Sequence, residues 1–150
     1  MEDDACRFCD IANRKIYSDI VYEDKEFMIF LDKIPIFKGH CLLIPKAHYV
    51  TIMDTPDMMV EKAFLLAKKI SSSIKEAINC DGILLLVNNV VSQSVPHLHI
   101  HVIPRKKGVV LKGFMWPREG YSSEDEAKKF AEAIKRCINR DVYSEEGKKV

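Results

Sequence analysis

The fold of this chain is decided by the segment Gln93-Ser94-Val95-Pro96-His97-Leu98-His99-Ile100-His101-Val102-Ile103, in which histidines alternate with apolar residues. Alternate side chains of a β-strand point to the same face at intervals of about 6.6 Å. The segment therefore predicts a strand over residues 97–103 that carries three imidazoles on one surface. The apolar side chains between them would line the opposite face and pack against helices.

These three histidines indicate chemistry rather than packing. An unperturbed imidazole has a pKa of roughly 6.5, so its neutral ring can act as nucleophile, hydrogen-bond donor or metal ligand at cell pH. A hydrolytic metal site would usually add carboxylate ligands, and none lies beside this segment. Gln93 and Ser94 instead supply an amide and a hydroxyl that can hold phosphate oxygens. The combination predicts phosphoryl chemistry by a histidine nucleophile, through a covalent adduct.

The remaining sequence predicts further strands and helices around this segment. Strand-like runs occupy residues 20–22 and 27–31, which form a hairpin, and residues 41–44 and 83–87. A short helix is predicted over residues 7–14. A long amphipathic helix is predicted from Thr55, as N-cap, with Pro56 in its first turn, to Ile78.

A last helix, capped by Ser122 or Ser123, carries apolar residues on one face as far as Ile138. After the short helix, the order of elements is β-β-β-α-β-β-α. This order predicts an α+β domain with an antiparallel sheet of about five strands, a long helix and a C-terminal helix.

The length and composition of the chain limit the class of protein to which it can belong. The length of 150 residues predicts a single domain, over residues 1–144, and the charged end predicts a flexible tail over residues 145–150. The net charge of +1 gives no field that would favour nucleic acid, and no apolar run approaches the roughly 20 residues that span a bilayer. The acidic N-terminus is unlike a secretory signal, so we expect a cytoplasmic location without disulfides.

The histidine segment resembles the Q-[ST]-V-x-H-x-H-x-H signature of histidine triad (HIT) proteins. The similarity continues, in family order, through Cys6-Arg7-Phe8-Cys9-Asp10-Ile11, Phe30-Leu31-Asp32, Gly39-His40, Ile44-Pro45-Lys46-Ala47-His48 and Met115-Trp116-Pro117. It points to the nucleotide-binding branch that has an N-terminal C-x-x-C pair. The resemblance implies the HIT-like fold and a homodimer formed through the long helix and a neighbouring strand.

The resemblance also implies roles for individual residues. His99 would be the nucleophile that attacks the α-phosphorus, while His101 and Ser94 would contact the phosphate and help the leaving group depart. Asp32 would bind the ribose hydroxyls. The rest of the implied nucleotide site comprises Phe8 and Ile11 at the base, and Asn88, Gln93 and Ser94 near the phosphate or ribose. Phe8 and Ile11 are equally compatible with core packing, and Asp32 with a turn.

Cys6 and Cys9 have the spacing of a zinc knuckle, although no second C-x-x-C pair accompanies them. The resemblance implies that His48 and His97 complete a site with four nitrogen and sulfur ligands, which would make the zinc structural. Two alternatives stay open. The cysteines could be reduced thiols in a mobile N-terminus, or the protein could be a zinc hydrolase, which would lose activity on chelation without unfolding.

The chain departs from the family pattern in two places. The stretch between Asn88 and Gln93 is shorter than usual and contains Val90 and Val91, and Ser92 stands where the family has glycine, which lets backbone N–H groups approach phosphate. This change predicts altered access for the leaving group or slower turnover. Lys33 stands where an apolar residue is common, which leaves the base and sugar preference open.

The resemblance implies a hydrolase or nucleotidyl transferase that cleaves the α-phosphate bond of nucleoside 5′-phosphoramidates or related conjugates through a nucleotidyl-histidine intermediate. Its partner would be a purine nucleotide. Ser94 and the segment Met115-Trp116-Pro117 favour the phosphoramidate branch. The alternatives are a dinucleoside polyphosphate hydrolase and a nucleotide-binding adaptor with little turnover.

Overall fold

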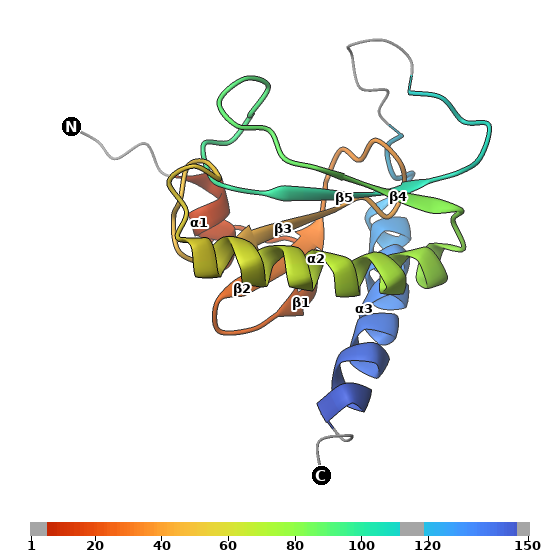
Figure 1. Cartoon of the computed structure of the whole chain (residues 1–150). Helices are drawn as coiled ribbons and strands as arrows, with labels where there is room; N and C mark the ends of the chain where they lie inside the picture. Colours follow the sequence, from red (N-terminus) through yellow and green to blue (C-terminus); the bar gives the residue numbers. More distant parts are fainter. Residues whose placement is uncertain (1–5, 112–118, 147–150) are drawn as a thin grey trace.

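The computed structural model describes residues 6–111 and 119–146, and the predicted family tail at residues 115–117 lies outside them. Its elements follow the predicted order (Figure 1). The helices are α1 (Arg7–Ala12), α2 (Asp57–Ile78) and α3 (Glu124–Glu146), and the strands are β1 (Ile20–Glu23), β2 (Phe27–Leu31), β3 (Cys41–Pro45), β4 (Gly82–Leu86) and β5 (Ile100–Arg105). α3 thus continues into the predicted tail, and the division at residue 144 stays a prediction.

The strands form one antiparallel sheet in the order β1-β2-β3-β5-β4. The α+β class and the five-stranded sheet predicted from the sequence are therefore confirmed. The hairpin between β1 and β2 is held by Asp24, whose Oδ1 accepts hydrogen bonds from the backbone N–H groups of Glu26 and Phe27. Such a side-chain acceptor replaces the strand bonds that the turn cannot make.

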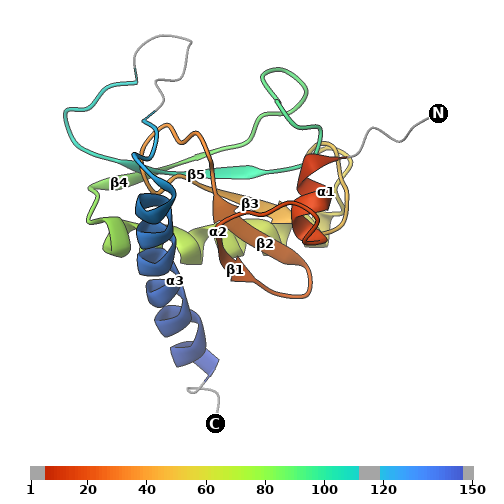
Figure 2. The same cartoon turned by 180° about the vertical axis from the view of Figure 1, so that it is seen from behind.

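Alternation along the strands divides the core into two layers. Phe27, Ile29 and Leu31 pack with buried residues of α2 and α3 on one face of the sheet. Met28 and Phe30 pack with α1 on the other face. Figure 2 shows α1 on the side of the sheet opposite α2. The face toward α1 is the one that carries the site.

Two local predictions were wrong. The last strand begins at Ile100 rather than at residue 97, because the N–H of Leu98 bonds the carbonyl of Tyr49 in a loop instead of a neighbouring strand. α2 begins at Asp57 without a side-chain cap, because the hydroxyl of Thr55 donates to the carbonyl of Thr51, 2.7 Å away. In the described residues, no helix has the length and apolar character needed to cross a membrane.

Candidate active site and metal centre

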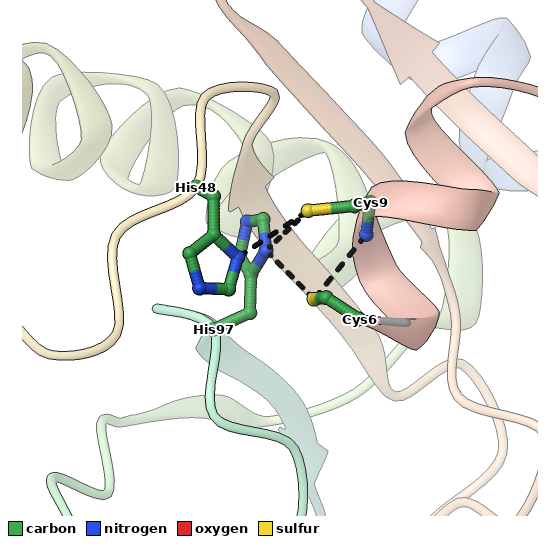
Figure 3. A group of neighbouring side chains, drawn as sticks. All are labelled: Cys6, Cys9, His48 and His97. Atoms are coloured by element: carbon green, nitrogen blue, oxygen red, sulfur yellow. Dashed lines mark hydrogen bonds between the residues drawn. The ribbon is translucent and has the colours of Figure 1, made fainter. Parts of the chain in front are cut away.

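Two cysteines and two histidines from three parts of the chain meet beside α1 (Figure 3). Cys6 is the N-cap of α1 and Cys9 lies in its first turn, so the helix brings both thiols to one side. His48 follows β3 and His97 precedes β5. All four ligand atoms lie within 4.8 Å of one another. The structure therefore brings together the four residues that the sequence assigned to a metal.

The distances in this cluster match those between ligands of one metal ion. Cys6 Sγ and Cys9 Sγ lie 3.3 Å and 3.5 Å from His97 Nδ1, and Cys9 Sγ lies 3.3 Å from His48 Nδ1. Tetrahedral Zn–S and Zn–N bonds of about 2.3 Å and 2.0 Å place their ligand atoms about 3.5 Å apart. The four donors thus have the chemistry and the spacing of a closed tetrahedral site.

Hydrogen bonding prepares His97 to act as a ligand. Its Nε2 lies 2.8 Å from the carbonyl oxygen of Pro45, which can only accept, so Nε2 carries the proton and Nδ1 presents its lone pair to the thiols. Burial lowers the pKa of His97 to about 4, which keeps the ring neutral. Burial and the neighbouring Cys6 raise the pKa of Cys9 to about 11, a shift that a bound cation would oppose by favouring the thiolate.

A pocket of about 280 Å³ lies on the same face of the sheet. It contains the predicted nucleophile and phosphate contacts, the predicted ribose carboxylate and both predicted base contacts. These residues are His99, His101, Ser94, Asp32, Phe8 and Ile11. Phe8 serves both sites, because its ring meets His97 and His99 edge-on at centroid distances of 5.9 Å and 5.1 Å. The position of α1 therefore affects the metal cluster and the pocket together.

His99 is held in the form that a nucleophile requires. Its ring is only 2% exposed, and its Nδ1 lies 2.7 Å from the carbonyl oxygen of His97, so Nδ1 carries the proton and Nε2 keeps its lone pair. Burial lowers the pKa of His99, although the hydrogen bond to His97 and the charge of Asp32 oppose the shift. The neutral ring can accordingly attack an electrophile through Nε2.

A second chain of hydrogen bonds fixes the tautomer of His101. The backbone N–H of Ile36 donates to His40 Nδ1 at 3.2 Å, so the remaining proton of a neutral His40 is on Nε2. His40 Nε2 lies 2.9 Å from His101 Nδ1 and donates to it. His101 is left with its own proton on Nε2. Its ring lies 4.8 Å from that of His99, centroid to centroid.

His40 is the functional residue that sequence reasoning missed. It is 1% exposed, and the sequence marks it only as part of Gly39-His40, without a role. Asp32, His40 and His101 also have ligand atoms within 4.8 Å of one another. Because the two nitrogens of His40 are occupied by Ile36 and His101, this group is a hydrogen-bonded chain rather than a metal cluster.

Two predicted nucleotide contacts do not line this pocket. Gln93 donates through Nε2 to the carbonyl of Val50 and accepts through Oε1 from the N–H of Val90, at 2.5 Å and 2.9 Å. Asn88 Nδ2 donates to the carbonyl of Ser92 at 3.2 Å. These bonds hold the loop in shape next to Ser94, and a direct contact of Asn88 or Gln93 with nucleotide stays a prediction.

The shortened loop has an unusual backbone. Val90 and Ser92 have φ angles of 71° and 61°, in the left-handed region that favours glycine. Ser92 therefore has a backbone conformation that favours glycine, the residue that the family has at this position. The neighbouring Val91 does not have a positive φ and, like Val90, is mostly exposed.

Replacing Val90 with glycine is expected to raise the free energy of unfolding by about 1 kcal/mol, because it removes a β-branched side chain from a left-handed conformation. Val91→Gly is the matched control, since it removes the same side chain from an ordinary conformation and should lower stability by about 0.5–1 kcal/mol. Urea unfolding of both variants measures the difference. Equal effects of the two substitutions would show that Val90 stores no strain.

Comparison of the sequence with known proteins identifies a family and several relatives. The HIT domain matches residues 13–108. Adenylylsulfatase HINT3 of Arabidopsis thaliana is 34% identical over 142 residues, 93% of this chain and 70% of that protein. Adenosine 5′-monophosphoramidase HNT1 of Saccharomyces cerevisiae is 35% identical over 122 residues, 78% of this chain and 73% of that protein.

Among solved structures, a zinc-bound histidine triad family protein of Mycobacterium smegmatis superposes with a TM-score of 0.80 at 26% identity, over 93% of this chain and 97% of that chain. The family match at residues 13–108 covers the histidine segment, His40 and Asp32. It does not cover the cysteine pair or the described residues from 119 onward.

Proposed function

The chain belongs to the HIT family, and we propose that it cleaves the α-phosphate bond of nucleoside 5′-phosphoramidates or related nucleotide conjugates. The observation that carries this proposal is the lone pair on Nε2 of His99, in the pocket that also contains Asp32, Ser94 and His101. A nucleophile, a carboxylate and phosphate-binding donors are thereby gathered in a space large enough for part of a nucleotide. The names of two relatives, an adenylylsulfatase and an adenosine 5′-monophosphoramidase, support the same substrate class.

The reaction would proceed in two displacements. In the first, His99 Nε2 forms a bond to the α-phosphorus while the bond from phosphorus to the leaving nitrogen or oxygen breaks. A leaving amine takes a proton relayed from solvent through His101 or Ser94, whereas a leaving sulfate departs as its anion. In the second, a water oxygen attacks the same phosphorus and the N–P bond breaks. The bond's electron pair returns to Nε2 of a neutral His99, a proton of the water is lost to solvent, and a nucleoside 5′-monophosphate is released. The adduct carries positive charge on the His99 ring, which the hydrogen bond from Nδ1 to the His97 carbonyl stabilises.

The neighbouring groups would stabilise charge on the phosphate. His101 presents its Nε2 proton as a donor, because its Nδ1 already accepts from His40. The Ser94 hydroxyl adds a second donor at the pocket wall. Asp32 would accept from the ribose hydroxyls, with its Oδ1 already held by the N–H of Ile34 at 2.9 Å. Phe8 and Ile11 would bind the base, with a purine favoured.

We assign zinc to Cys6, Cys9, His48 and His97. When bound there, the ion would supply a structural cross-link between α1, the segment that follows β3 and the segment that precedes β5. Its four ligands leave no position for a water, which argues against a zinc hydrolase. His97 connects this site to the nucleophile, because its side chain would hold the metal while its carbonyl orients His99. Cysteines that bind a metal are typical of a reducing compartment, so we also propose a cytoplasmic location.

A comparison of substrates tests the proposed activity. Turnover should be fastest with adenosine 5′-phosphoramidate or adenosine 5′-phosphosulfate and slower with a diadenosine polyphosphate. Faster cleavage of the polyphosphate would favour a dinucleoside polyphosphate hydrolase. Tight AMP binding without turnover of any of the three compounds would favour the adaptor function.

We also propose a homodimer formed through α2 and β4. β4 is an edge strand with Leu85 39% exposed, and α2 exposes Phe64 and Leu65 by 39% and 54%. Apolar side chains on adjoining edges of a domain are typical of an interface between subunits. A second copy of this chain would cover them.

Replacing Leu65 with glutamate is expected to convert the dimer to monomers, weakening association by at least about 100-fold because a charge would be buried among apolar side chains. Analytical ultracentrifugation over a range of concentrations measures the change. Val110→Glu is the control, since Val110 is 72% exposed and lies outside α2 and β4. A monomeric wild-type protein, or a dimer that survives in Leu65→Glu, would contradict this interface.

A further inference from the structure

Residues 119–126 lie beyond the HIT domain match and contact the loop between Asp32 and His40. The N–H of Glu119 donates to the carbonyl of Pro35 at 2.8 Å, and Glu119 Oε2 accepts from the N–H of Lys38 at 3.1 Å. Lys38 Nζ then donates to Glu126 Oε1 at 3.0 Å. Glu119, Glu126 and Tyr121 together form what we call the C-terminal clamp.

Tyr121 is the member of the clamp nearest the active site. Its hydroxyl oxygen accepts a hydrogen bond of 2.9 Å from the N–H of Gly39, the residue that directly precedes His40. The ring is held in place by an edge-on contact with Phe130 at a centroid distance of 5.5 Å. Burial raises the pKa of Tyr121, so the phenol keeps its proton. This contact therefore persists across the physiological pH range.

Gly39 is also closely packed against a side chain of α2. Its φ of +92° is in the left-handed region, and a Cβ added there would lie 2.9 Å from Cγ1 of Ile78. Gly39 is thus in close contact with the side chain of Ile78 and, through its N–H, with the phenol of Tyr121. The carbonyl of His40 in turn accepts from the N–H of Asp32 at 2.9 Å. The backbone that carries both Asp32 and His40 is consequently fixed at its two ends.

From these contacts we infer that Tyr121 is a positioning residue for the active site. By holding Gly39, it keeps the Nε2 proton of His40 directed at Nδ1 of His101, and so keeps the Nε2 proton of His101 available to the phosphate. A hydrogen bond between two rings depends on their alignment, which a loosened backbone would degrade. The consequence for turnover rests on the function proposed above, whereas the consequence for the tautomer of His101 does not.

The test is the variant Tyr121→Phe, which keeps the ring on Phe130 and removes only the hydroxyl. We expect kcat to fall about tenfold, with KM within about twofold of wild type, because phosphate stabilisation is weakened and the nucleotide contacts are intact. Tyr22→Phe is the matched control. It removes a phenol that bonds Asp24 at 2.8 Å on the distant β1 hairpin, and it should leave kcat unchanged.

Nitrogen NMR of the histidine rings provides a readout that does not depend on activity. In the wild type, His40 and His101 should both show a protonated Nε2 and an unprotonated Nδ1. Tyr121→Phe should shift His101 toward a mixture of tautomers. An unchanged His101 signal, or a fall in kcat equal to that of Tyr22→Phe, would overturn the proposal. A shifted signal in a protein that turns over no conjugate would instead uphold the clamp and refute the proposed function.

Discussion

Replacing His99 with alanine is expected to reduce turnover by at least about 1,000-fold while leaving AMP binding within about tenfold, or roughly 1.4 kcal/mol. The reason is that bond formation and nucleotide binding depend on different residues of the pocket. His99 is the proposed nucleophile because its Nδ1 proton is held by the His97 carbonyl and its Nε2 keeps a lone pair, whereas the proposed ribose and base contacts would come from Asp32, Phe8 and Ile11. The nucleotide should therefore still bind in the absence of the nucleophile.

Parallel kinetics and calorimetry check this result, with AMP as the ligand in the binding experiment. The ring of His99 is buried, so the thermal unfolding of the variant must be measured to show that it is folded. His101→Ala is a useful comparison, because it removes a phosphate donor rather than the nucleophile and should reduce turnover by a smaller factor of about 100. Substantial turnover by a folded His99→Ala variant would remove His99 from the role of nucleophile.

We expect wild-type protein to hold about one zinc ion per chain, and replacing Cys9 with serine to eliminate it and to lower the free energy of unfolding by about 3 kcal/mol or more. The expected loss is large because Cys9 Sγ lies within 3.5 Å of Nδ1 of both histidines, and a serine hydroxyl in its place is a much weaker zinc ligand than a thiolate. Without the ion, α1 would lose its cross-link to His48 and His97 and keep its apolar packing on the sheet, so Phe8 would be held less firmly beside His99.

Elemental analysis and chemical unfolding of the two proteins measure these changes. Cys137→Ser is the matched control, since Cys137 lies on α3 outside the cluster and should leave the metal content unchanged. A chelator should abolish activity and lower stability together. Equal zinc in wild type and Cys9→Ser would refute the site, and loss of activity at unchanged stability would favour a catalytic zinc.

The order of elements was predictable because each one carries a local signal. A short continuous run of β-favouring apolar residues marked β2, and regular helical spacing marked α2, whose buried side chains at Ala63, Ala67 and Ile70 lie at those positions. The exact start of β5 was not predictable, since it depends on a distant hydrogen bond between Leu98 and Tyr49. Likewise, Thr55 has the residue type of a helix cap, but a nearby carbonyl competes for its hydroxyl.

The residues of the site also differ in whether the sequence alone could indicate them. His97, His99 and His101 were recognisable from spacing alone, and Cys6 and Cys9 from theirs. His40 and Tyr121 were not recognisable, because their importance lies in contacts that span 61 and 82 residues of sequence. Spacing also cannot assign a proton to one ring nitrogen. That assignment needs the partner of each nitrogen, such as the carbonyl of His97 for Nδ1 of His99.

Mass spectrometry of enzyme quenched during turnover tests the central claim most directly. Wild-type protein mixed with adenosine 5′-phosphoramidate is quenched in alkaline denaturant, which preserves the acid-labile N–P bond, and then digested and sequenced. We predict one adenylyl group per modified chain, attached to His99 and absent from His99→Ala. Turnover without any adduct, or an adenylyl group on His101 or on another residue, would contradict it.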